Sequence, residues 1–307
     1  MNEIKKKHFR TLRILLTNEC TLKCKYCCAE GHKSQYSHFN VKNIERTISI
    51  FNQYFEIDRI KLTGGEPFCV AEINDIIQQI NDKFHNQTIS IVSNGTNTEK
   101  ISALTSAYKD LDLTISLPSL DKEMFQEITG RSDLYRNVIN TVNLLGVEKR
   151  YPIKINCVLV DGFTNSVDNI RAIINRYSEY HNISIRFLEL SINGVNKRDI
   201  SELGYKSTFG VFLNIMLQMG YRMVENSDTR ESCLFTKNGI IVKYIKYFCD
   251  VNCSVCPESK TSIWVSCDGY ISCCPLNPDR QILLENFGND EIHEKLDMNF
   301  DKFDSAD

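Results

Sequence analysis

Segments with the composition of β-strands alternate along most of the chain with segments that show the apolar spacing of helices. The expected strands are 11–17, 58–63, 88–93, 113–117, 153–160 and 183–188, and the expected helices are 41–55, 71–84, 99–108, 121–128, 134–145 and 167–180. Six strand-then-helix units in series predict a parallel sheet, because parallel neighbours need a crossover connection. Six strands do not close an eight-stranded barrel, so we predict an α/β fold with a partial (β/α)6 barrel.

Chemically distinctive residues gather at the ends of these expected strands. They are the cysteine-rich stretch 17–27, Gly64-Gly65-Glu66-Pro67, Ser93-Asn94-Gly95, Ser116, Asn156 or Val160, and Glu189. Ligands bind beyond the C-terminal ends of the strands in folds of this kind. We therefore expect the functional site at that edge of the barrel.

Three cysteines follow the first expected strand in a C-x3-C-x2-C pattern, at Cys20, Cys24 and Cys27. Iron–sulfur clusters are held by cysteine thiolates, and three ligands on a four-iron cluster leave one iron open for chemistry. The alternative is a zinc site, since cysteines two apart often bind zinc. The nearest histidines, His32 and His38, lack zinc-finger spacing, so the stretch favours a cluster.

This cysteine pattern resembles that of the radical S-adenosylmethionine (SAM) superfamily. In that family the open iron of a [4Fe-4S] cluster binds SAM, and one electron cleaves SAM to a 5′-deoxyadenosyl radical. An aromatic residue precedes the third cysteine in the family, and Tyr26 occupies that position. The resemblance also implies SAM contacts at Gly64, Gly65, Glu66, Pro67, Ser93, Asn94 and Ser116.

The glycine pair also has an interpretation of its own, apart from the resemblance. Gly64 and Gly65 lack side chains and adopt positive φ easily, which lets the backbone approach a ligand closely. Glu66 is suited to accept hydrogen bonds from a charged amine. A plain strand-to-helix turn remains the alternative, because glycine and proline are ordinary turn residues.

Several segments resemble more specifically the GTP 3′,8-cyclase family of molybdenum cofactor biosynthesis. They are 12–14, 60–67, 116–117, 128–131, 153–156 and 185–189, so the resemblance covers most of residues 8–195. It assigns substrate triphosphate contacts to Arg13, Arg59, Lys61, Lys154 and Arg186. We expect these five cations to converge at the barrel mouth, where an anion would offset their desolvation. Each alone has the alternative of being a solvated surface charge.

A second group of cysteines lies near the C-terminus. Cys253, Cys256 and Cys274 resemble the ligands of a second, auxiliary [4Fe-4S] cluster in the cyclase and in twitch and SPASM enzymes, where an Asp-Gly turn such as Asp268-Gly269 precedes the last ligand. Structural zinc is the alternative, and ligation by Cys249, Cys267 or Cys273 stays open. Cysteines outside the two groups are expected to be small buried hydrophobes: Cys28, Cys69, Cys157, Cys233, Cys249, Cys267 and Cys273.

The chain departs from the cyclase pattern just after the second late cysteine. The family carries Arg-x-Arg there, and this chain has Glu258 and Lys260. Replacing a guanidinium by a carboxylate reverses a charge, which disfavours a nucleotide anion or alters how its base is handled. This departure argues against the ordinary cyclase reaction.

The overall composition excludes several classes of protein. The 307 residues carry a formal charge of −3, which provides no global basic field for nucleic acid or an anionic membrane. Residues 1–10 have no signal-peptide pattern and no apolar run suffices to span a bilayer, so we expect a cytoplasmic protein. Residues 1–200 are expected to form the barrel, and 201–307 an auxiliary-cluster domain with a helix at 205–219, hairpins at 233–248 and 262–274, and a polar tail.

These observations predict a radical SAM enzyme that abstracts hydrogen from a substrate. We expect a nucleotide-like or other small anion, possibly phosphorylated, in a cyclase-like rearrangement, with flavodoxin or ferredoxin as electron donor. One alternative is modification of a ribosomally made precursor peptide, suggested by the auxiliary domain and the missing arginines. A second alternative is a non-catalytic zinc or iron–sulfur module, which would not cleave SAM.

Overall fold

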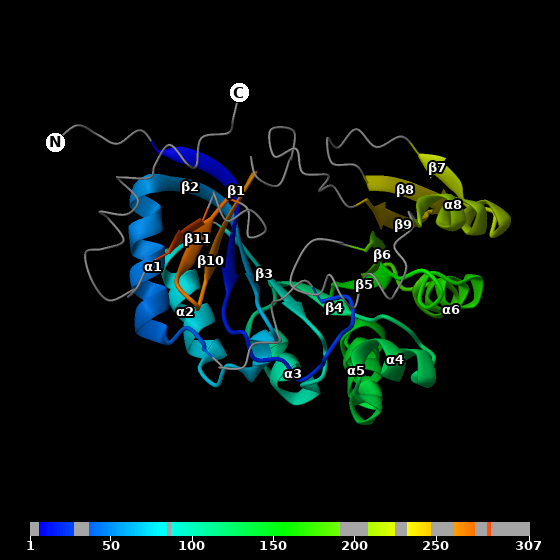
Figure 1. The fold of residues 1–307 in the computed structure, drawn as a ribbon, viewed down its shortest axis with the longest axis horizontal. Coiled ribbons are helices and arrows are strands. Elements are labelled where there is room, and N and C mark those ends of the chain that lie inside the picture. The colour runs from blue at the N-terminus through cyan, green and yellow to red at the C-terminus, as the bar shows by residue number, and fades with distance from the viewer. Residues whose placement is uncertain are drawn as a thin grey trace.

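The computed structural model describes residues 6–27, 37–84, 87–190, 208–224, 232–246, 261–273 and 281–283. Figure 1 shows their strands as a strongly curved sheet with helices along its outer side. The strands are β1 (Lys7–Leu15), β2 (Phe55–Thr63), β3 (Thr88–Ser93), β4 (Asp112–Ser116), β5 (Ile153–Leu159), β6 (Ile183–Glu189), β7 (Arg222–Val224), β8 (Ser232–Lys237), β9 (Ile240–Ile245), β10 (Ser262–Ser266), β11 (Tyr270–Ser272) and β12 (Gln281–Leu283).

Helices connect the first six strands and cover one face of the sheet (Figure 1). The connecting helices are α1 (Val41–Tyr54), α2 (Ile73–Lys83), α3 (Thr98–Ala107), α4 (Lys122–Thr129), α5 (Tyr135–Val142) and α6 (Val167–Tyr177), with the 3₁₀ turns η1 (Pro67–Cys69) and η2 (Ser132–Leu134) and the π-helical segment η3 (Asn143–Glu148). Helix α8 (Phe209–Gln218) follows β6. In the described part of the chain, no helix is both long and apolar enough to cross a bilayer.

The order of the strands is β12-β11-β10-β1-β2-β3-β4-β5-β6-β9-β8-β7. Strands β1 to β6 are parallel neighbours, as the alternating pattern predicted. The expected hairpins are β8–β9 and β10–β11, and they add to opposite edges: β10 runs parallel to β1, and β9 runs parallel to β6. The structure is therefore an α/β fold with a partial barrel. The division at residue 200 stays a prediction, since strands from beyond it continue the same sheet.

Local signals explain where the helices begin and end. Asn40, Asp121 and Ser166 accept hydrogen bonds from the backbone N–H three residues ahead, which caps α1, α4 and α6. Gly130 ends α4 in the left-handed conformation, at φ 70°. These caps fix the lengths of the helices and hence the positions of the loops that follow the strands.

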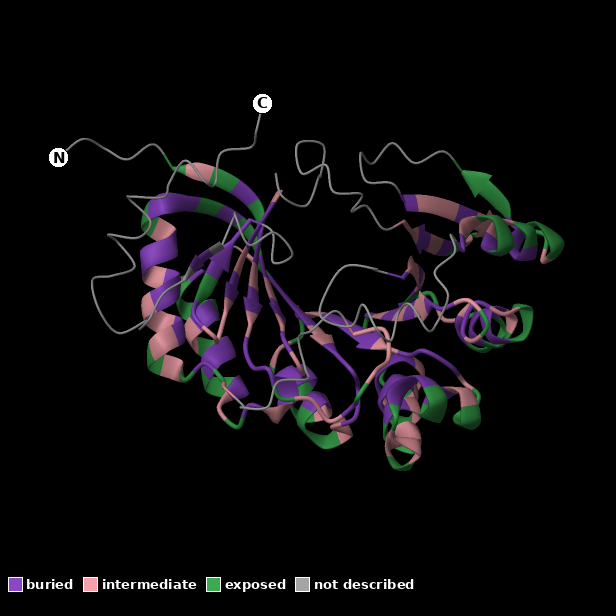
Figure 2. Ribbon diagram, viewed as in Figure 1, coloured by how far each residue is buried: buried purple, intermediate pink, exposed green. Residues whose placement is uncertain are grey.

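The two faces of the sheet differ in character. Apolar residues such as Leu12, Ile14, Ile60 and Leu62 alternate along the strands and are fully buried beneath the helices. Figure 2 colours buried residues purple, and they lie along the strands and on the helices that cover them. The residues between them, Arg13 among them, face the concave side. The site is therefore built on a rigid and well-packed wall.

Candidate active site

The cysteine stretch lies against the turn that follows β2. The N–H of Gly65 donates to the carbonyl of Thr17 (2.6 Å), and the N–H of Glu66 donates to the carbonyl of Glu19 (2.7 Å). An added Cβ would lie 2.4 Å from the Thr17 oxygen at Gly64 and 2.1 Å from the Glu19 oxygen at Gly65. The glycines were predicted to let backbone approach a ligand. In the structure, they let the turn after β2 lie directly against the backbone of the cysteine stretch.

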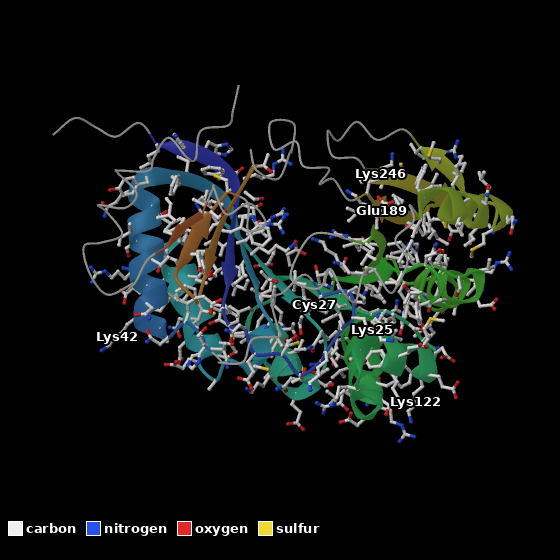
Figure 3. The ribbon with its side chains drawn as sticks, in the orientation of Figure 1. Lys25, Cys27, Lys42, Lys122, Glu189 and Lys246 are labelled. Carbon is white, nitrogen blue, oxygen red and sulfur yellow. The ribbon has the colours of Figure 1, made fainter. Side chains whose placement is uncertain are left out.

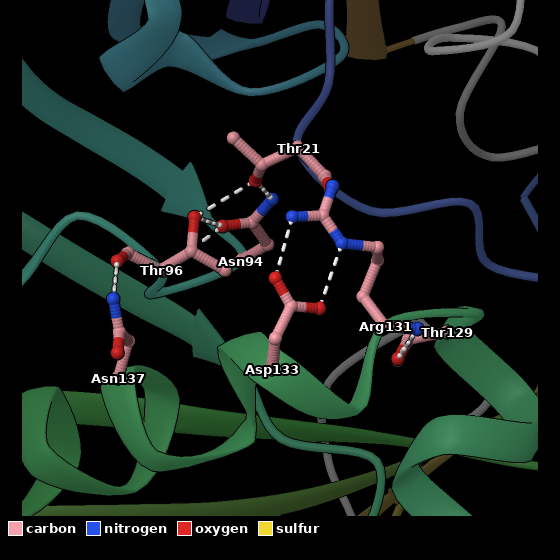
Figure 4. Close-up of polar contacts among 7 residues, drawn as sticks. All are labelled: Thr21, Asn94, Thr96, Thr129, Arg131, Asp133 and Asn137. Carbon is pink, nitrogen blue, oxygen red and sulfur yellow. Dashed lines mark hydrogen bonds and ion pairs between the residues drawn. The ribbon is translucent and has the colours of Figure 1, made fainter.

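The other side of the cysteine stretch is held by the end of α4. Lys23 N donates to the carbonyl of Thr129 and Lys25 N to that of Ile128, both at 2.9 Å. The guanidinium of Arg131 donates to the carbonyl of Thr21 (3.2 Å) and pairs with Asp133 (Figure 4). The cysteine stretch is thus fixed between two strand-end loops. Arg131 was not predicted to have this role, although the cyclase resemblance included its segment.

The three cysteines lie in a partly buried region. Burial raises the pKa of the Cys20 thiol to about 11, and burial together with the neighbouring Cys27 and Cys20 thiolates raises that of Cys24. Figure 3 shows Cys27 near the middle of the molecule. Thiols of this kind ionise when a cation offsets the mutual repulsion of their thiolates, and the irons of a cluster supply that charge. The donor set therefore fits an iron–sulfur cluster.

The thiols are not arranged around one point. Among the described residues, no three His, Cys, Asp or Glu side chains lie close enough together to hold a single metal ion. A [4Fe-4S] cluster is bound through separate iron corners, so its thiolates need not meet at one point.

Asn94 connects the end of β3 to the first cysteine. Its Nδ2 lies 3.5 Å from Cys20 Sγ and 2.9 Å from Thr21 Oγ1, while its Oδ1 accepts from the backbone N–H and hydroxyl of Thr96 (Figure 4). Asn137 donates to the Thr96 carbonyl and supports this turn from α5. Asn94 was predicted to contact SAM, and the structure adds a hydrogen bond to a candidate cluster ligand. Hydrogen bonds to such sulfurs tune the potential of a cluster.

Glu66 is 1% exposed and lies between the turn after β2 and the end of β3. Its carboxylate accepts from Ser93 Oγ (2.8 Å), Asn94 N (2.6 Å) and Phe68 N (3.2 Å). Burial raises its pKa to about 7, although these donors oppose the shift. Glu66 was predicted to accept from an amine, and in the structure it joins two strand ends.

The remaining predicted SAM contacts also lie near the cysteine stretch or at strand ends. Tyr26 packs on the small apolar cluster that contains Ile128, Val160 and Leu190, and burial raises its pKa. Ser116 ends β4, and Pro67 begins the turn η1. The roles of these residues toward SAM stay predictions.

All five predicted cations face the concave side of the sheet. Paired residues of neighbouring strands share a side, and so do residues two apart on one strand. We call this side the inner face and define it by Arg13, Arg59, Lys61, Ser90, Asp112, Lys154, Asn156, Arg186 and Trp264. The cations lie along the strands, below the strand ends where they were expected.

Trp264 and Asp112, which lie on the inner face, were not singled out from the sequence. Trp264 pairs with Arg13 across β10 and β1, and the guanidinium of Arg13 stacks on its ring at 4.6 Å. Asp112 opens β4, and its Oδ2 accepts from Lys154 Nζ. Only the pairing of neighbouring strands shows that Trp264 and Asp112 lie on the same side of the sheet as the cations. That strand register would have been the signal needed to find them.

The late cysteines Cys253, Cys256 and Cys274 lie outside the described residues, as do Glu258 and Lys260. The Asp-Gly turn is described, and Asp268 Oδ1 accepts from Ser37 Oγ (2.7 Å) and Asn18 Nδ2 (3.2 Å). The β10–β11 hairpin is therefore attached to the cysteine stretch. Among the cysteines expected to be buried hydrophobes, Cys157 and Cys273 are buried, whereas Cys69, Cys233 and Cys267 are only partly buried.

The sequence matches the radical SAM superfamily over residues 14–175, which is more than half of the chain. The fold and the site thus define an enzyme of the kind that couples a [4Fe-4S] cluster to SAM. The chain belongs to the radical SAM superfamily.

Curated relatives extend this similarity over nearly the whole chain. A probable GTP 3′,8-cyclase of Sulfurisphaera tokodaii is 26% identical, and the match covers 94% of this chain and 88% of that protein. A GTP 3′,8-cyclase of Aquifex aeolicus is 27% identical, with 86% and 81% covered. The similarity to cyclases that was inferred from short segments is confirmed.

Solved structures share the fold at low sequence identity. SuiB of Streptococcus suis, bound to its precursor peptide SuiA, superimposes with a TM-score of 0.65 at 16% identity, covering 97% of this chain and 65% of SuiB. The enzyme anSMEcpe with bound AdoMet gives a TM-score of 0.61 at 13% identity, with 94% and 80% covered. This chain therefore spans about two thirds of SuiB. The predicted partial barrel is confirmed.

Proposed function

We propose that Cys20, Cys24 and Cys27 hold the SAM-binding [4Fe-4S] cluster and that the enzyme abstracts hydrogen from a small anionic, nucleotide-like substrate bound on the inner face. The observation that carries this proposal is the alignment of five cations on one side of the sheet, below the cysteine stretch. The cyclase relatives support a nucleotide-like substrate and a cyclase-like rearrangement.

The electrostatics of the inner face support an anion. Burial lowers the pKa of Arg186 and of Lys154, which means that the charged forms are disfavoured there. Asn156 Oδ1, Arg186 Nε and Trp264 Nε1 are buried and have no hydrogen-bond partner among the described residues. A buried polar atom without a partner costs about 1–3 kcal/mol. A polar anion would satisfy the donors and offset the positive charge.

The bound cluster and SAM would supply the radical that removes the hydrogen. The chain itself supplies orientation and exclusion of water. The glycine turn and Arg131 fix the cysteine stretch, Asn94 orients Cys20, and Ser93, Asn94 and Ser116 lie at the strand ends predicted to contact SAM.

The rest of the proposal concerns cofactors and partners. Cys253, Cys256 and Cys274 would hold a second [4Fe-4S] cluster within a domain formed by residues 201–307, and flavodoxin or ferredoxin would donate the electron. A cytoplasmic location fits these ligands, because that compartment keeps thiols reduced. A C253A/C256A variant that retains the iron and sulfide content of the wild type would contradict the second cluster.

The test is anaerobic reconstitution with iron, sulfide, dithionite and SAM. Mass spectrometry then measures 5′-deoxyadenosine and the deuterium that it receives from labelled nucleotides. We expect R186Q to reduce turnover at least tenfold and to weaken nucleotide binding, whereas R136Q, at an exposed position of α5, does neither. Equal behaviour of the two variants, or no nucleotide binding by the wild type, would refute the anionic substrate.

Modification of a ribosomally made peptide is the second candidate. The fold likeness to SuiB with its precursor peptide favours it, as do Glu258 and Lys260 in place of the cyclase arginines. Transfer of deuterium from a labelled short peptide, but from no nucleotide, would establish this function instead. A gene neighbourhood without a short precursor gene would count against it.

A non-catalytic iron–sulfur or zinc module is the third candidate, and SAM cleavage in the same assay would exclude it. Cleavage of SAM that depends on Cys20, Cys24 and Cys27 requires a redox-active site, which zinc cannot provide.

A further inference from the structure

Among the described residues that define the inner face, Asp112 provides the one carboxylate beside the cations. Asp112 is the first residue of β4, and its side chain is 17% exposed. Its Oδ2 accepts from Lys154 Nζ, on the neighbouring strand β5, and from Ser90 Oγ, on β3, at 3.2 Å. Three adjacent strands therefore contribute to one polar cluster, and the carboxylate is held from both sides.

The charges of Arg59 and Arg186 also act on this cluster. Burial by itself would raise the pKa of Asp112, but Lys154, Ser90 and Arg59 together lower it. Burial lowers the pKa of Arg186, Asp112 opposes that shift, and Arg59 adds to it. Asp112 is thus the negative partner of three cations, and it stays ionised beside them.

A carboxylate in this position opposes the binding of a highly charged anion. The carboxylate of Asp112 already forms an ion pair with the ammonium of Lys154, so this ammonium is less available to a ligand. The carboxylate also repels any further negative charge that binds on the inner face. The repulsion grows with the charge of the ligand, because Coulomb energy is proportional to both charges. The partial burial of the cluster keeps this effect from being screened fully by salt.

We propose that Asp112 is a specificity-determining residue that restricts the inner face to ligands of low negative charge, such as a monophosphate or a carboxylate, and disfavours triphosphates. This inference rests on the proposed function, because it assumes that the substrate binds on the inner face. The substrate would then differ in charge from the GTP named for the cyclase relatives.

The experiment measures binding of inorganic phosphate, pyrophosphate and tripolyphosphate to the anaerobically reconstituted enzyme by calorimetry. D112N removes the charge and keeps the shape, while D110N makes the same change at an exposed position two residues earlier. We expect D112N to bind tripolyphosphate about tenfold more tightly, which corresponds to about 1.4 kcal/mol, and phosphate at most about threefold more tightly. D110N should change neither affinity.

The effect of D112N on anion binding is also measured in a K154Q background, which lacks the ammonium of Lys154. In K154Q the carboxylate of Asp112 has lost the ammonium of Lys154, so the double variant D112N/K154Q should bind tripolyphosphate about tenfold more tightly than K154Q does. This comparison tests the inference even if D112N alone, with an unpaired Lys154, does not fold. D112E, which keeps the charge, should retain the ligand preference of the wild type.

The outcomes separate this inference from the proposed function. If the wild type binds these anions and D112N matches D110N, Asp112 does not set the charge preference, and the proposed substrate class stands. If only variants without Asp112 bind anions, the role of Asp112 is supported and an anionic substrate for the wild type is refuted. If none binds any of the three anions, both are refuted.

Discussion

The most restrictive contact in the site is made by a residue without a side chain. Gly65 does not adopt a positive φ, so glycine is required there for steric reasons alone: a Cβ would lie 2.1 Å from the Glu19 carbonyl oxygen. Backbone atoms on both sides are held by hydrogen bonds and do not yield as the tip of a flexible side chain would. The glycine sets the distance between the cysteine stretch and the turn after β2.

Replacing Gly65 by alanine should therefore separate the cysteine stretch from this turn. We expect a loss of about 1–3 kcal/mol in the free energy of unfolding, as for other overpacked sites, and failure to assemble the cluster. Chemical denaturation and iron analysis measure the two effects. Gly210→Ala is the control, since nothing lies within 4 Å of its added Cβ and it sits in α8, where alanine is favoured. A stable G65A protein with a full cluster would contradict the argument.

The buried carboxylate of Glu66 makes stability depend on pH. Burial raises its folded pKa to about 7, above the ordinary value of 4.5. The folded state therefore binds more protons than the unfolded state between these values, and stability falls as pH rises from about 4.5 to about 7. The full change amounts to about 3 kcal/mol.

We expect E66Q, measured on the cluster-free protein, to abolish this part of the pH dependence. Denaturation midpoints at pH 5 and pH 8 should differ less in E66Q than in the wild type, whereas E179Q, at an exposed position, should behave as the wild type does. If the midpoints of E66Q at pH 5 and pH 8 differ as much as those of the wild type, Glu66 has an ordinary pKa.

At the scale of the elements, the β10–β11 hairpin is attached to the cysteine stretch through one carboxylate. Asp268 Oδ1 accepts from Ser37 Oγ and Asn18 Nδ2, and Asn18 Oδ1 in turn accepts from Ser37 N (2.8 Å). The N–H of Cys267 also donates to the Leu15 carbonyl at the end of β1 (3.1 Å). A late segment of the chain thus braces the loop that carries the first cysteines.

Asp268→Ala should loosen both segments together. Hydrogen exchange followed by mass spectrometry should show faster exchange in 16–27 and in 262–272, with little change in β3 to β6, because those strands do not touch the contact. D168A, at an exposed position of α6, serves as the control. Exchange that rises only in the hairpin would show that the contact does not support the cysteine stretch.

The sequence predicted some elements better than others, for physical reasons. Strands β3 and β6 were predicted almost to the residue, because in each the apolar residues largely alternate with polar ones and the strand ends at polar or turn residues. The start of β2 was missed, since Phe55 follows α1 without a turn and continues its apolar pattern. Asp112 was missed because one acidic residue at a strand start carries no signal until the register with Ser90 and Lys154 is known.

At the scale of the whole molecule, the parallel centre was predictable and its edges were not. Six repeated units specify neighbouring parallel strands through local connections. The pairing of β10 with β1 and of β9 with β6 joins segments far apart in the sequence, and no local pattern encodes it. The five cations were named from the sequence, but only the register shows that they share the inner face of the sheet.

The fold should persist without its cluster. The main apolar core lies between the sheet and the helices, whereas Cys20 and Cys24 only pack against its edge and Cys27 is partly exposed. Removing the cluster by chelation under oxidising conditions, or by C20A/C24A/C27A, should therefore leave the far-ultraviolet circular dichroism unchanged and abolish SAM cleavage. The melting temperature should fall by a few degrees, about what 1 kcal/mol produces in a protein of this size. Reconstitution of the chelated wild type should restore both properties. Loss of secondary structure on chelation would instead show that the cluster organises the barrel.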